Sequence, residues 1–378
     1  MTNNTLKVKV CVIFGGVSGE HEISLLSAKS ILGALDPEKY EVIQIGITHD
    51  GVWLCGNDLL SRFSNGDFVG LDQALLLADP TRKGIYRIHS SQNSEILEMM
   101  SQADVVFPIL HGTFGEDGTI QGLFELANVA YVGSGVAASA VGMDKGIFKD
   151  VMRANGLPVV NSIVFTRKDI QNKLENVLET AEKIASYPLF VKPANLGSSV
   201  GVHKCHNQSE LIKGLHDAAR YDRRILVEKG VNAREIEVSV LGNEDPIASC
   251  PGEIIPSDEF YSYRAKYLDN QTQLLIPAPL NEEQTKLAQD LALRAFKAID
   301  GAGMARVDML LDKDTGEIFI NEINTIPGFT QISMYPKLWN ASGISYPQLV
   351  DRLIRLALDR KSERQKTIYR YQRETEIK

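Results

Sequence analysis

FINEINTIPG (Phe319–Gly328) begins as a β-strand that carries polar side chains where packing residues are expected. Ile320 and Ile323 favour a strand. Glu322 and Asn324 are two residues apart, and on a strand this spacing directs both side chains to the same face. A carboxylate beside an amide on one face needs a reason other than packing.

A partner strand precedes this stretch. ARVDMLLD (Ala305–Asp312) has strand character, and KDTG separates it from the second strand. A three-residue loop, Asp314–Gly316, would place Gly316 in the left-handed conformation that such loops need. A register shifted by one residue would divide the polar residues between two faces. The predicted register puts two pairs on one face of the ribbon: Asp308 opposite Glu322, and Arg306 opposite Asn324.

The two facing carboxylates indicate a cation site. Asp308 and Glu322 repel each other at this distance unless a cation or a shared proton lies between them. Together with the Asn324 carbonyl they offer only oxygen ligands, which suit Mg²⁺ completed by water and phosphate oxygens. The alternative to a metal site is a solvent-exposed hairpin face whose charged residues have no specific function. Apolar residues flank each polar one on both strands, which argues against it. The pattern therefore favours a metal site with an arginine beside it.

Composition narrows the class of protein. The chain has 378 residues, 44% of them hydrophobic, and its net charge of -8 argues against a nucleic-acid partner. The first apolar run is too short for a signal peptide, and no later segment approaches the roughly 20 apolar residues of a membrane helix. The four cysteines are scattered without metal spacing, which is typical of reduced thiols in a cytoplasmic protein.

The chain reads as three successive parts. The first third alternates strand and helix patterns and predicts a parallel α/β layer. A smaller α+β part follows from about Met143, and its first helix pattern ends at Gly156. The last third contains a long polar and aromatic stretch, Pro256–Gln273, without either period, which is typical of a lid or binding loop. Asn281 is expected to cap a helix that runs to about Ile299.

Phosphate binding is expected in the middle of the chain. No G-x-x-x-x-G-K-[ST] motif occurs, and the glycines of GGVSG (residues 15–19) lack the full dinucleotide fingerprint, so a dehydrogenase has little support. A strand is expected to end at Lys192 and to lead into a Gly/Ser loop within FVKPANLGSSVGVHKC (Phe190–Cys205). Amides and hydroxyls of such a loop can close over phosphates while the lysine supplies charge. Lys145 is a candidate for a second phosphate lysine.

The motifs, taken in order, resemble the D-alanine–D-alanine ligases of the ATP-grasp superfamily. The resemblance spans roughly Val8 to Leu358 and rests on GGVSGEHEIS, HGTFGEDGTIQG, GSGVAASAVGMDK, VKPANLGSSVGV, VEKGVNAREIEVSV, RAKY, ARVDMLL and NEINTIPG. It implies an ATP-grasp fold of mixed α/β and α+β character, with ATP between the central and C-terminal domains. The expected parts are an N-terminal substrate domain (1–135), a central domain (136–232), a C-terminal domain (233–360) and a charged tail (361–378).

The resemblance also implies a role for individual residues. The expected nucleotide contacts are Lys145, Lys192, Ser199, Glu228, Lys229, Val231, Glu235 and Lys266. Asp308, Glu322 and Asn324 would hold two Mg²⁺ ions, with Mn²⁺ as an alternative metal. Glu20, linked through Ser198 to Tyr267 of the lid, would bind the first D-alanine, and Arg306 with the Gly328 amide would stabilise the reacting carboxyl oxygens. Ser333 and Met334 would border the second D-alanine, and His111 lies in a family motif near the substrates.

The implied reaction joins two D-alanines through an acyl phosphate and releases ADP and phosphate for peptidoglycan precursor synthesis. The family also implies a cytoplasmic homodimer. Ligases that make D-alanyl-D-lactate or D-alanyl-D-serine are the nearest alternative, and Tyr267 in RAKY favours the dipeptide over the lactate product. A non-catalytic ATP-binding protein would be expected to lose the arginine or the metal ligands, which are all present.

Three features depart from the family pattern. An insertion is expected at about Leu54–Ile96, and the tail after Lys361 has no family role. Met334 stands where many members have leucine, a volume-conserving exchange that a pocket tolerates well.

Overall fold

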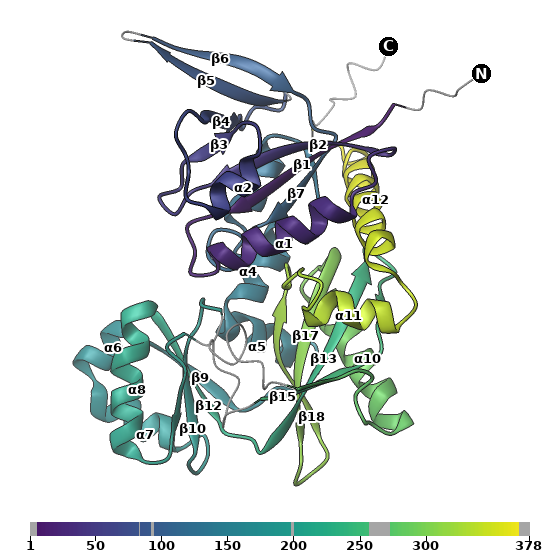
Figure 1. Cartoon of the computed structure of the whole chain (residues 1–378). Helices are drawn as coiled ribbons and strands as arrows, with labels where there is room; N and C mark the ends of the chain where they lie inside the picture. The colour runs from purple at the N-terminus through teal and green to yellow at the C-terminus, as the bar shows by residue number, and fades with distance from the viewer. Residues whose placement is uncertain (1–5, 83, 92–93, 198–199, 257–272, 370–378) are drawn as a thin grey trace, which may run out of the picture.

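The computed structural model describes residues 6–82, 84–91, 94–197, 200–256 and 273–369. Within these residues the chain forms three β-sheets that follow one another along the sequence. In Figure 1 the first sheet lies at one end of the molecule, and the other two lie beside each other at the opposite end. This is the mixed α/β and α+β architecture that the sequence predicts.

The first sheet has the strand order β6-β5-β4-β3-β2-β1-β7-β8. Its parallel part consists of β1 (Val8–Gly15), β2 (Tyr40–Ile47), β7 (Val105–Ile109) and β8 (Ala130–Tyr131). The central strands are runs of buried Val, Ile and Phe, as is typical of parallel strands covered on both faces. The helices of this part are α1 (His21–Ala34), α2 (Leu59–Ser64) and α3 (Thr119–Leu126).

The segment predicted as an insertion extends this sheet with antiparallel strands. These are β3 (Trp53–Cys55), β4 (Asp72–Leu76), β5 (Ile85–Ser91) and β6 (Ser94–Ser101). β5 and β6 form a hairpin that projects from the molecule (Figure 1). β6 is the edge strand, and it exposes Ile96, Leu97 and Met99 to solvent.

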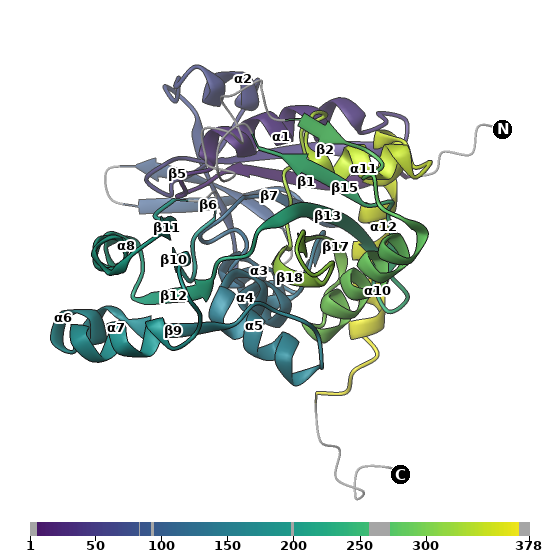
Figure 2. The same ribbon diagram turned by 90° about the horizontal axis from the view of Figure 1, so that it is seen from below.

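The second sheet is antiparallel, with the order β11-β10-β12-β9. Its strands are β9 (Ser162–Thr166), β10 (Leu189–Pro193), β11 (His203–Cys205) and β12 (Arg224–Lys229). Three helices lie on one face of it in Figure 1: α6 (Arg167–Asn172), α7 (Leu174–Glu182) and α8 (Gln208–Tyr221). The opposite face is directed toward the third sheet, as Figure 2 also shows.

The third sheet has the order β16-β15-β13-β17-β18, with β14 paired to β13. Its strands are β13 (Ala233–Gly242), β14 (Ile247–Ala248), β15 (Gly252–Ile255), β16 (Gln273–Leu275), β17 (Gly303–Asp312) and β18 (Ile318–Asn324). The helix expected after Asn281 is α10 (Glu282–Ala298), and Asn281 with Gln284 forms its capping box. None of the helices in the described part of the chain is long and apolar enough to cross a membrane.

Two helices pack differently from the prediction. α4 (Val136–Met143) and α5 (Lys145–Ala154) were expected in the central domain, 136–232. Their residues Ala138, Phe148 and Met152 instead belong to the core of the third sheet, with α10. An apolar helix face is buried against whichever sheet it reaches, and the sequence alone did not identify that sheet.

The β17–β18 hairpin has the predicted pairing at the site and a different turn. Asp308 pairs with Glu322 and Arg306 with Asn324, which confirms the expected face. The loop has four residues, because Asp312 N–H donates to the Glu317 carbonyl at 2.9 Å. Gly316 is left-handed, with φ +76°, as predicted.

A bulge reconciles this longer loop with the predicted pairing. The register shifts between Asp308 and Met309, so Asn321 has no direct partner on β17. Ile320 and Ile323 are both buried although they are three residues apart. In a strand, two inward side chains at that spacing require one extra residue.

The C-terminal helices join the third sheet to the first. α11 (Met334–Ala341) and α12 (Tyr346–Arg364) contribute Trp339, Leu349 and Leu353 to a core that also contains residues of β1, β7 and α1. α12 continues past Lys361, where the charged tail was predicted to begin. The Lys361 ammonium donates to the Asn128 carbonyl at 2.7 Å, so this part of the tail is ordered helix.

Candidate active site

The face of the β17–β18 hairpin is densely hydrogen-bonded. The Arg306 guanidinium donates to both oxygens of Asp308, each at 2.7 Å. The Asn324 amide nitrogen donates to Asp308 Oδ2 at 3.0 Å, and Lys145 Nζ lies 3.3 Å from Glu322 Oε2. The four polar residues predicted to share this face therefore lie together, and a lysine from α5 joins them.

Arg306 has a further carboxylate partner that the sequence analysis did not identify. Its Nε lies 2.9 Å from Oε2 of Glu237, a nearly fully buried residue of β13. β13 pairs with β17 so that Glu237 lies opposite Asp308. The signal was present in the sequence, because Glu237 is two residues after Glu235 and shares its strand face.

The first turn of α5 places Lys145. The Asp144 carboxylate caps the helix by accepting from the amides of Gly146 and Ile147, both at 3.0 Å, and it forms an ion pair with Arg224 at 2.9 Å. Lys145 Nζ also donates to the Leu196 carbonyl at 3.0 Å, in the loop after β10. The cap thus fixes a cation between the hairpin and the predicted phosphate loop.

Glu228 lies in a buried cluster with two lysines. Its carboxylate forms ion pairs with Lys192 of β10 and with Lys149 of α5, the latter at 3.1 Å. Burial alone would raise the pKa of Glu228, but the attraction of the two ammonium groups lowers it to about 2. Burial lowers the pKa of Lys149. Lys149 was not predicted, although it follows Lys145 by four residues on the same helix face.

Glu20 connects the first sheet to the phosphate loop. It precedes α1, and a Cβ atom at Gly112 would lie 2.7 Å from its Oε2. A Cβ atom at Gly197 would lie 3.2 Å from the same oxygen. The Glu20 carboxylate therefore sits between the loop after β7 and the loop after β10, and a glycine in each loop leaves room for it.

The loop from β18 to α11 carries Gly328 and Ser333. A Cβ atom at Gly328 would lie 3.1 Å from Ser333 Oγ, so the two predicted substrate residues are adjacent. Ser333 Oγ also contacts the Thr330 hydroxyl at 2.7 Å. Met334 begins α11 and is buried in a small cluster with Ile254 and Leu338.

Comparison with known proteins identifies the family. The family described as D-ala D-ala ligase N-terminus matches residues 9–134, and D-ala D-ala ligase C-terminus matches residues 151–355. A D-alanine–D-alanine ligase from Heliobacterium modesticaldum is 50% identical over 361 residues, which cover 96% of this chain and 97% of the relative. The chain belongs to the D-alanine–D-alanine ligase family.

Solved structures agree with this assignment. The D-alanine-D-alanine ligase from Coxiella burnetii is 38% identical, with a TM-score of 0.79, over 96% of this chain and 97% of that one. The VanG D-Ala:D-Ser ligase from Enterococcus faecalis is 35% identical, with a TM-score of 0.82, over 93% and 99%. The chain has the ATP-grasp fold of this family, which confirms the fold expected from the sequence.

The hairpin residues fit the metal that the D-alanine–D-alanine ligase family implies. Asp308 and Glu322 are partly buried on adjacent strands, and cationic side chains accompany both carboxylates. Two partly buried carboxylates next to an amide form the oxygen donor set that Mg²⁺ prefers. The described residues contain no cluster of three or more His, Cys, Asp or Glu with metal geometry, and the hairpin set has two carboxylates and the Asn324 amide.

The remaining predicted nucleotide residues lie along the crossing from the second to the third sheet. Lys229 ends β12, Val231 is in the connection, and Glu235 is on β13. The connection between the two strands has only three residues, 230–232, so these positions follow Glu228 closely along the chain. Four predicted residues lie outside the described residues: Ser198, Ser199, Lys266 and Tyr267.

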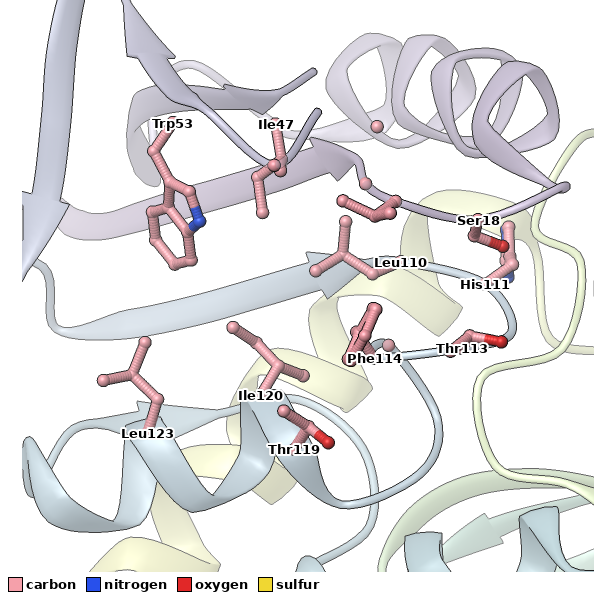
Figure 3. A pocket seen from close by; sticks show the side chains of 15 residues that line it. Ser18, Ile47, Trp53, Leu110, His111, Thr113, Phe114, Thr119, Ile120 and Leu123 are labelled. Carbon is pink, nitrogen blue, oxygen red and sulfur yellow. The ribbon is translucent and has the colours of Figure 1, made fainter. Parts of the chain in front are cut away.

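A cavity of about 250 Å³ adjoins the site on the side of the first sheet. It opens between the loops after β1 and β7, at the carboxyl ends of parallel strands, where ligands of such sheets commonly bind. Figure 3 shows Trp53, Ile47, Leu110 and Leu123 around it, with Ser18 and His111 at one end. Its walls are mostly apolar, and the hydroxyl of Ser18, one of its lining residues, accepts from the Glu20 amide at 3.1 Å.

Proposed function

We propose that this chain joins two D-alanine molecules to D-alanyl-D-alanine, with conversion of ATP to ADP and phosphate, for peptidoglycan precursor synthesis. The observation that carries the proposal is the cluster of two carboxylates and two cationic side chains at the β17–β18 hairpin. Arg306, Asp308 and Glu322 lie on one hairpin, and Lys145 reaches them from α5. Family membership supports the identity of the substrates.

The residues of the chain supply binding and orientation rather than a covalent intermediate. The carboxylate of the first D-alanine attacks the γ-phosphate of ATP, and ADP leaves as the acyl phosphate forms. The amine of the second D-alanine then displaces phosphate from the acyl phosphate and forms the peptide bond. Lys145 and Lys192 bring positive charge to the phosphates, and phosphoryl transfer depends mainly on such charge and on positioning. Glu20 binds the ammonium of the first D-alanine, between Gly112 and Gly197.

The second step places negative charge on the carboxyl oxygen of the first D-alanine. Arg306 and the Gly328 amide would stabilise it, and preorganised donors at such a position typically contribute about 3 kcal/mol each. Ser333, adjacent to Gly328, and Met334 would border the second D-alanine. Glu228, Lys229, Val231 and Glu235 would bind the adenine and ribose of ATP.

Asp308, Glu322 and Asn324 would hold two Mg²⁺ ions, with Mn²⁺ as an alternative. Bound there, divalent ions neutralise phosphate charge during transfer. We also propose a cytoplasmic location, where ATP is available. Cys11, Cys55, Cys205 and Cys250 are all unpaired thiols, which is consistent with a reducing compartment.

We propose that two copies associate as a homodimer. The free edge of β6 supports this, because an edge strand with Ile96, Leu97 and Met99 exposed is a surface that natural proteins usually cover. Light scattering of the purified chain measures the mass directly. A monomer at micromolar concentration would contradict the proposal.

The substrate assignment is tested by measuring phosphate release and product mass. Purified protein with ATP and Mg²⁺ receives D-alanine, L-alanine, D-serine, or D-alanine with D-lactate. D-Alanine alone should give the dipeptide at the highest rate, and Arg306→Ala should reduce it by about 100-fold or more. Preferential formation of D-alanyl-D-serine or of an ester would reassign the second substrate. No ATP turnover with any of them would reject the proposed ligase activity.

A further inference from the structure

Side chains of the first sheet's domain hold the backbone around Gly328 at several points. The Phe329 amide donates to Ser27 Oγ at 3.3 Å, and Ser27 Oγ lies 3.1 Å from His111 Nε2. His111 Nδ1 in turn lies 2.9 Å from the Ile326 carbonyl. These contacts close a ring that begins and ends on one loop, with Gly328 between its ends.

The direction of the hydrogen bonds in this ring is determined. The Ile326 carbonyl only accepts, so His111 Nδ1 carries the proton and donates to it. Nε2 of the neutral imidazole then accepts from the Ser27 hydroxyl, which accepts from the Phe329 amide. Burial lowers the pKa of His111, which favours this neutral form. Ser27 and His111 are both buried.

Two further contacts hold the same segment from outside the ring. The Ile326 amide donates to Glu116 Oε1 at 2.8 Å, and Glu116 Oε2 accepts from the Gly112 amide at 3.4 Å. The Tyr346 hydroxyl donates to the Phe329 carbonyl at 2.6 Å. Both backbone groups of Ile326 and both of Phe329 are therefore bonded to side chains from other elements.

We infer that Ser27 and His111 are positioning residues that fix the Gly328 amide for the reaction, and that His111 does so instead of contacting substrate. This inference rests on the proposed role of Gly328. Glycine has the widest backbone freedom of any residue, so the loop needs external constraints to hold one orientation of the Gly328 amide. An oxyanion donor is effective only when it is held at the position where charge develops.

The test compares two serines of α1. Ser27→Ala removes the hydroxyl that links Phe329 to His111. Ser24→Ala removes a buried hydroxyl that, among the residues the structure describes, bonds to Gly15 and Ile109 of the first sheet. Ser27→Ala should lower kcat at least about tenfold and leave the KM values for ATP and D-alanine within about twofold. Ser24→Ala should keep kcat within about twofold.

His111→Asn provides a second, independent variant. Asparagine retains an N–H for the Ile326 carbonyl but loses the acceptor for Ser27. The double variant Ser27→Ala/His111→Asn should be no slower than the slower single variant, because both changes open the same ring. Multiplicative losses, an unchanged kcat in Ser27→Ala, or an equal loss in Ser24→Ala would overturn the inference.

Amide hydrogen exchange separates this inference from the proposed activity. A peptide that contains residues 326–330 should exchange its amide hydrogens faster in Ser27→Ala than in wild type. In Ser24→Ala its exchange rate should equal that of the wild type. This readout does not require turnover, so it tests the ring even if the wild type makes another product. Equal exchange in all three proteins would show that the ring does not constrain the loop.

Discussion

At the scale of single residues, Glu322 is expected to be required for turnover and not for folding. Glu322→Gln keeps the shape of the side chain and removes the negative charge that faces Asp308 and Lys145. We expect kcat to fall about 100-fold or more, because neutralisation of phosphate charge depends on this carboxylate. Mg²⁺ with ATP should raise the Tm of the wild type and not of the variant, since ligands that bind the native state stabilise it.

The control for this prediction lies on the same hairpin. Glu317 is exposed at the far end, beside the loop, and Glu317→Gln should retain wild-type kcat and the Tm increase. A Glu322→Gln protein with wild-type rate at limiting Mg²⁺ would refute the metal assignment.

Glu116 makes the stability of the protein depend on pH. Burial and the nearby Glu20 raise its pKa to about 8, so the folded state holds a proton that the unfolded state releases above its ordinary pKa. Stability from this group is therefore fully present below the ordinary pKa and is lost as pH rises toward 8. Glu116→Gln keeps an acceptor for the Ile326 amide.

We expect Glu116→Gln to be more stable than wild type at pH 8.5 by on the order of 2 kcal/mol, a discounted value because the side chain is only partly buried. The difference should disappear near pH 4. Urea denaturation at both pH values measures it. A constant difference between the two pH values would show that Glu116 does not titrate in this range.

The sequence predicted the grouping of polar residues whose partners lie on the same hairpin. Arg306, Asp308, Glu322 and Asn324 follow from strand periodicity and one register. Ser27 was missed because its partner Phe329 is 302 residues away and nothing local distinguishes its hydroxyl. Contacts between distant elements depend on how the elements pack, and a single sequence does not specify that.

At the scale of elements, the hairpin illustrates a correct pairing predicted through an incorrect turn. The predicted three-residue loop omitted one residue, and the bulge at Asn321 compensates for the difference. The spacing of Ile320 and Ile323 contained the information, because both are buried. A bulge is recognisable from such spacing only when the burial of both residues is known.

The N-cap of α5 is expected to set ATP affinity. Asp144→Ala removes the acceptor for the amides of Gly146 and Ile147 and leaves Arg224 without its partner. We expect a loss of about 1–2 kcal/mol in stability. We also expect a several-fold increase in KM for ATP, because the cap orients Lys145.

Asn207→Ala is the matched control for that change. Asn207 caps α8 in the same way, through the Glu210 amide, and lies on the solvent side of the second sheet. It should lose similar stability and keep the wild-type KM. An unchanged KM in Asp144→Ala would show that Lys145 is not placed by the cap.

At the scale of the whole molecule, the first and third sheets are expected to unfold together. The chain has two tryptophans. Trp53 lies on β3 of the first sheet, and Trp339 of α11 belongs to the core that joins the first and third sheets. Each single-tryptophan variant keeps one fluorescent reporter for urea denaturation. Trp339→Phe keeps Trp53 and reports on the first sheet, and Trp53→Phe keeps Trp339 and reports on the shared core.

The two variants should give coincident transitions after correction for their own stabilities, because one core connects the reporters. Two separate midpoints would mean that the parts unfold independently. The sequence predicted three successive parts, but it did not predict this shared core. α12 lies more than 200 residues after β8 in the chain, and its apolar face covers β7 and β8.

The position of α12 also governs when the protein can fold during its synthesis. The first sheet is complete once β8 has been made, yet the helix that covers it is nearly the last element of the chain. At about 5–20 residues per second, roughly 10–40 s pass before α12 follows β8 out of the ribosome. During that interval Leu25, Ile31 and their neighbours on α1 lack their final partners. This nascent surface is where a chaperone that binds apolar segments would act, and a premature stop before Tyr346 would leave it exposed permanently.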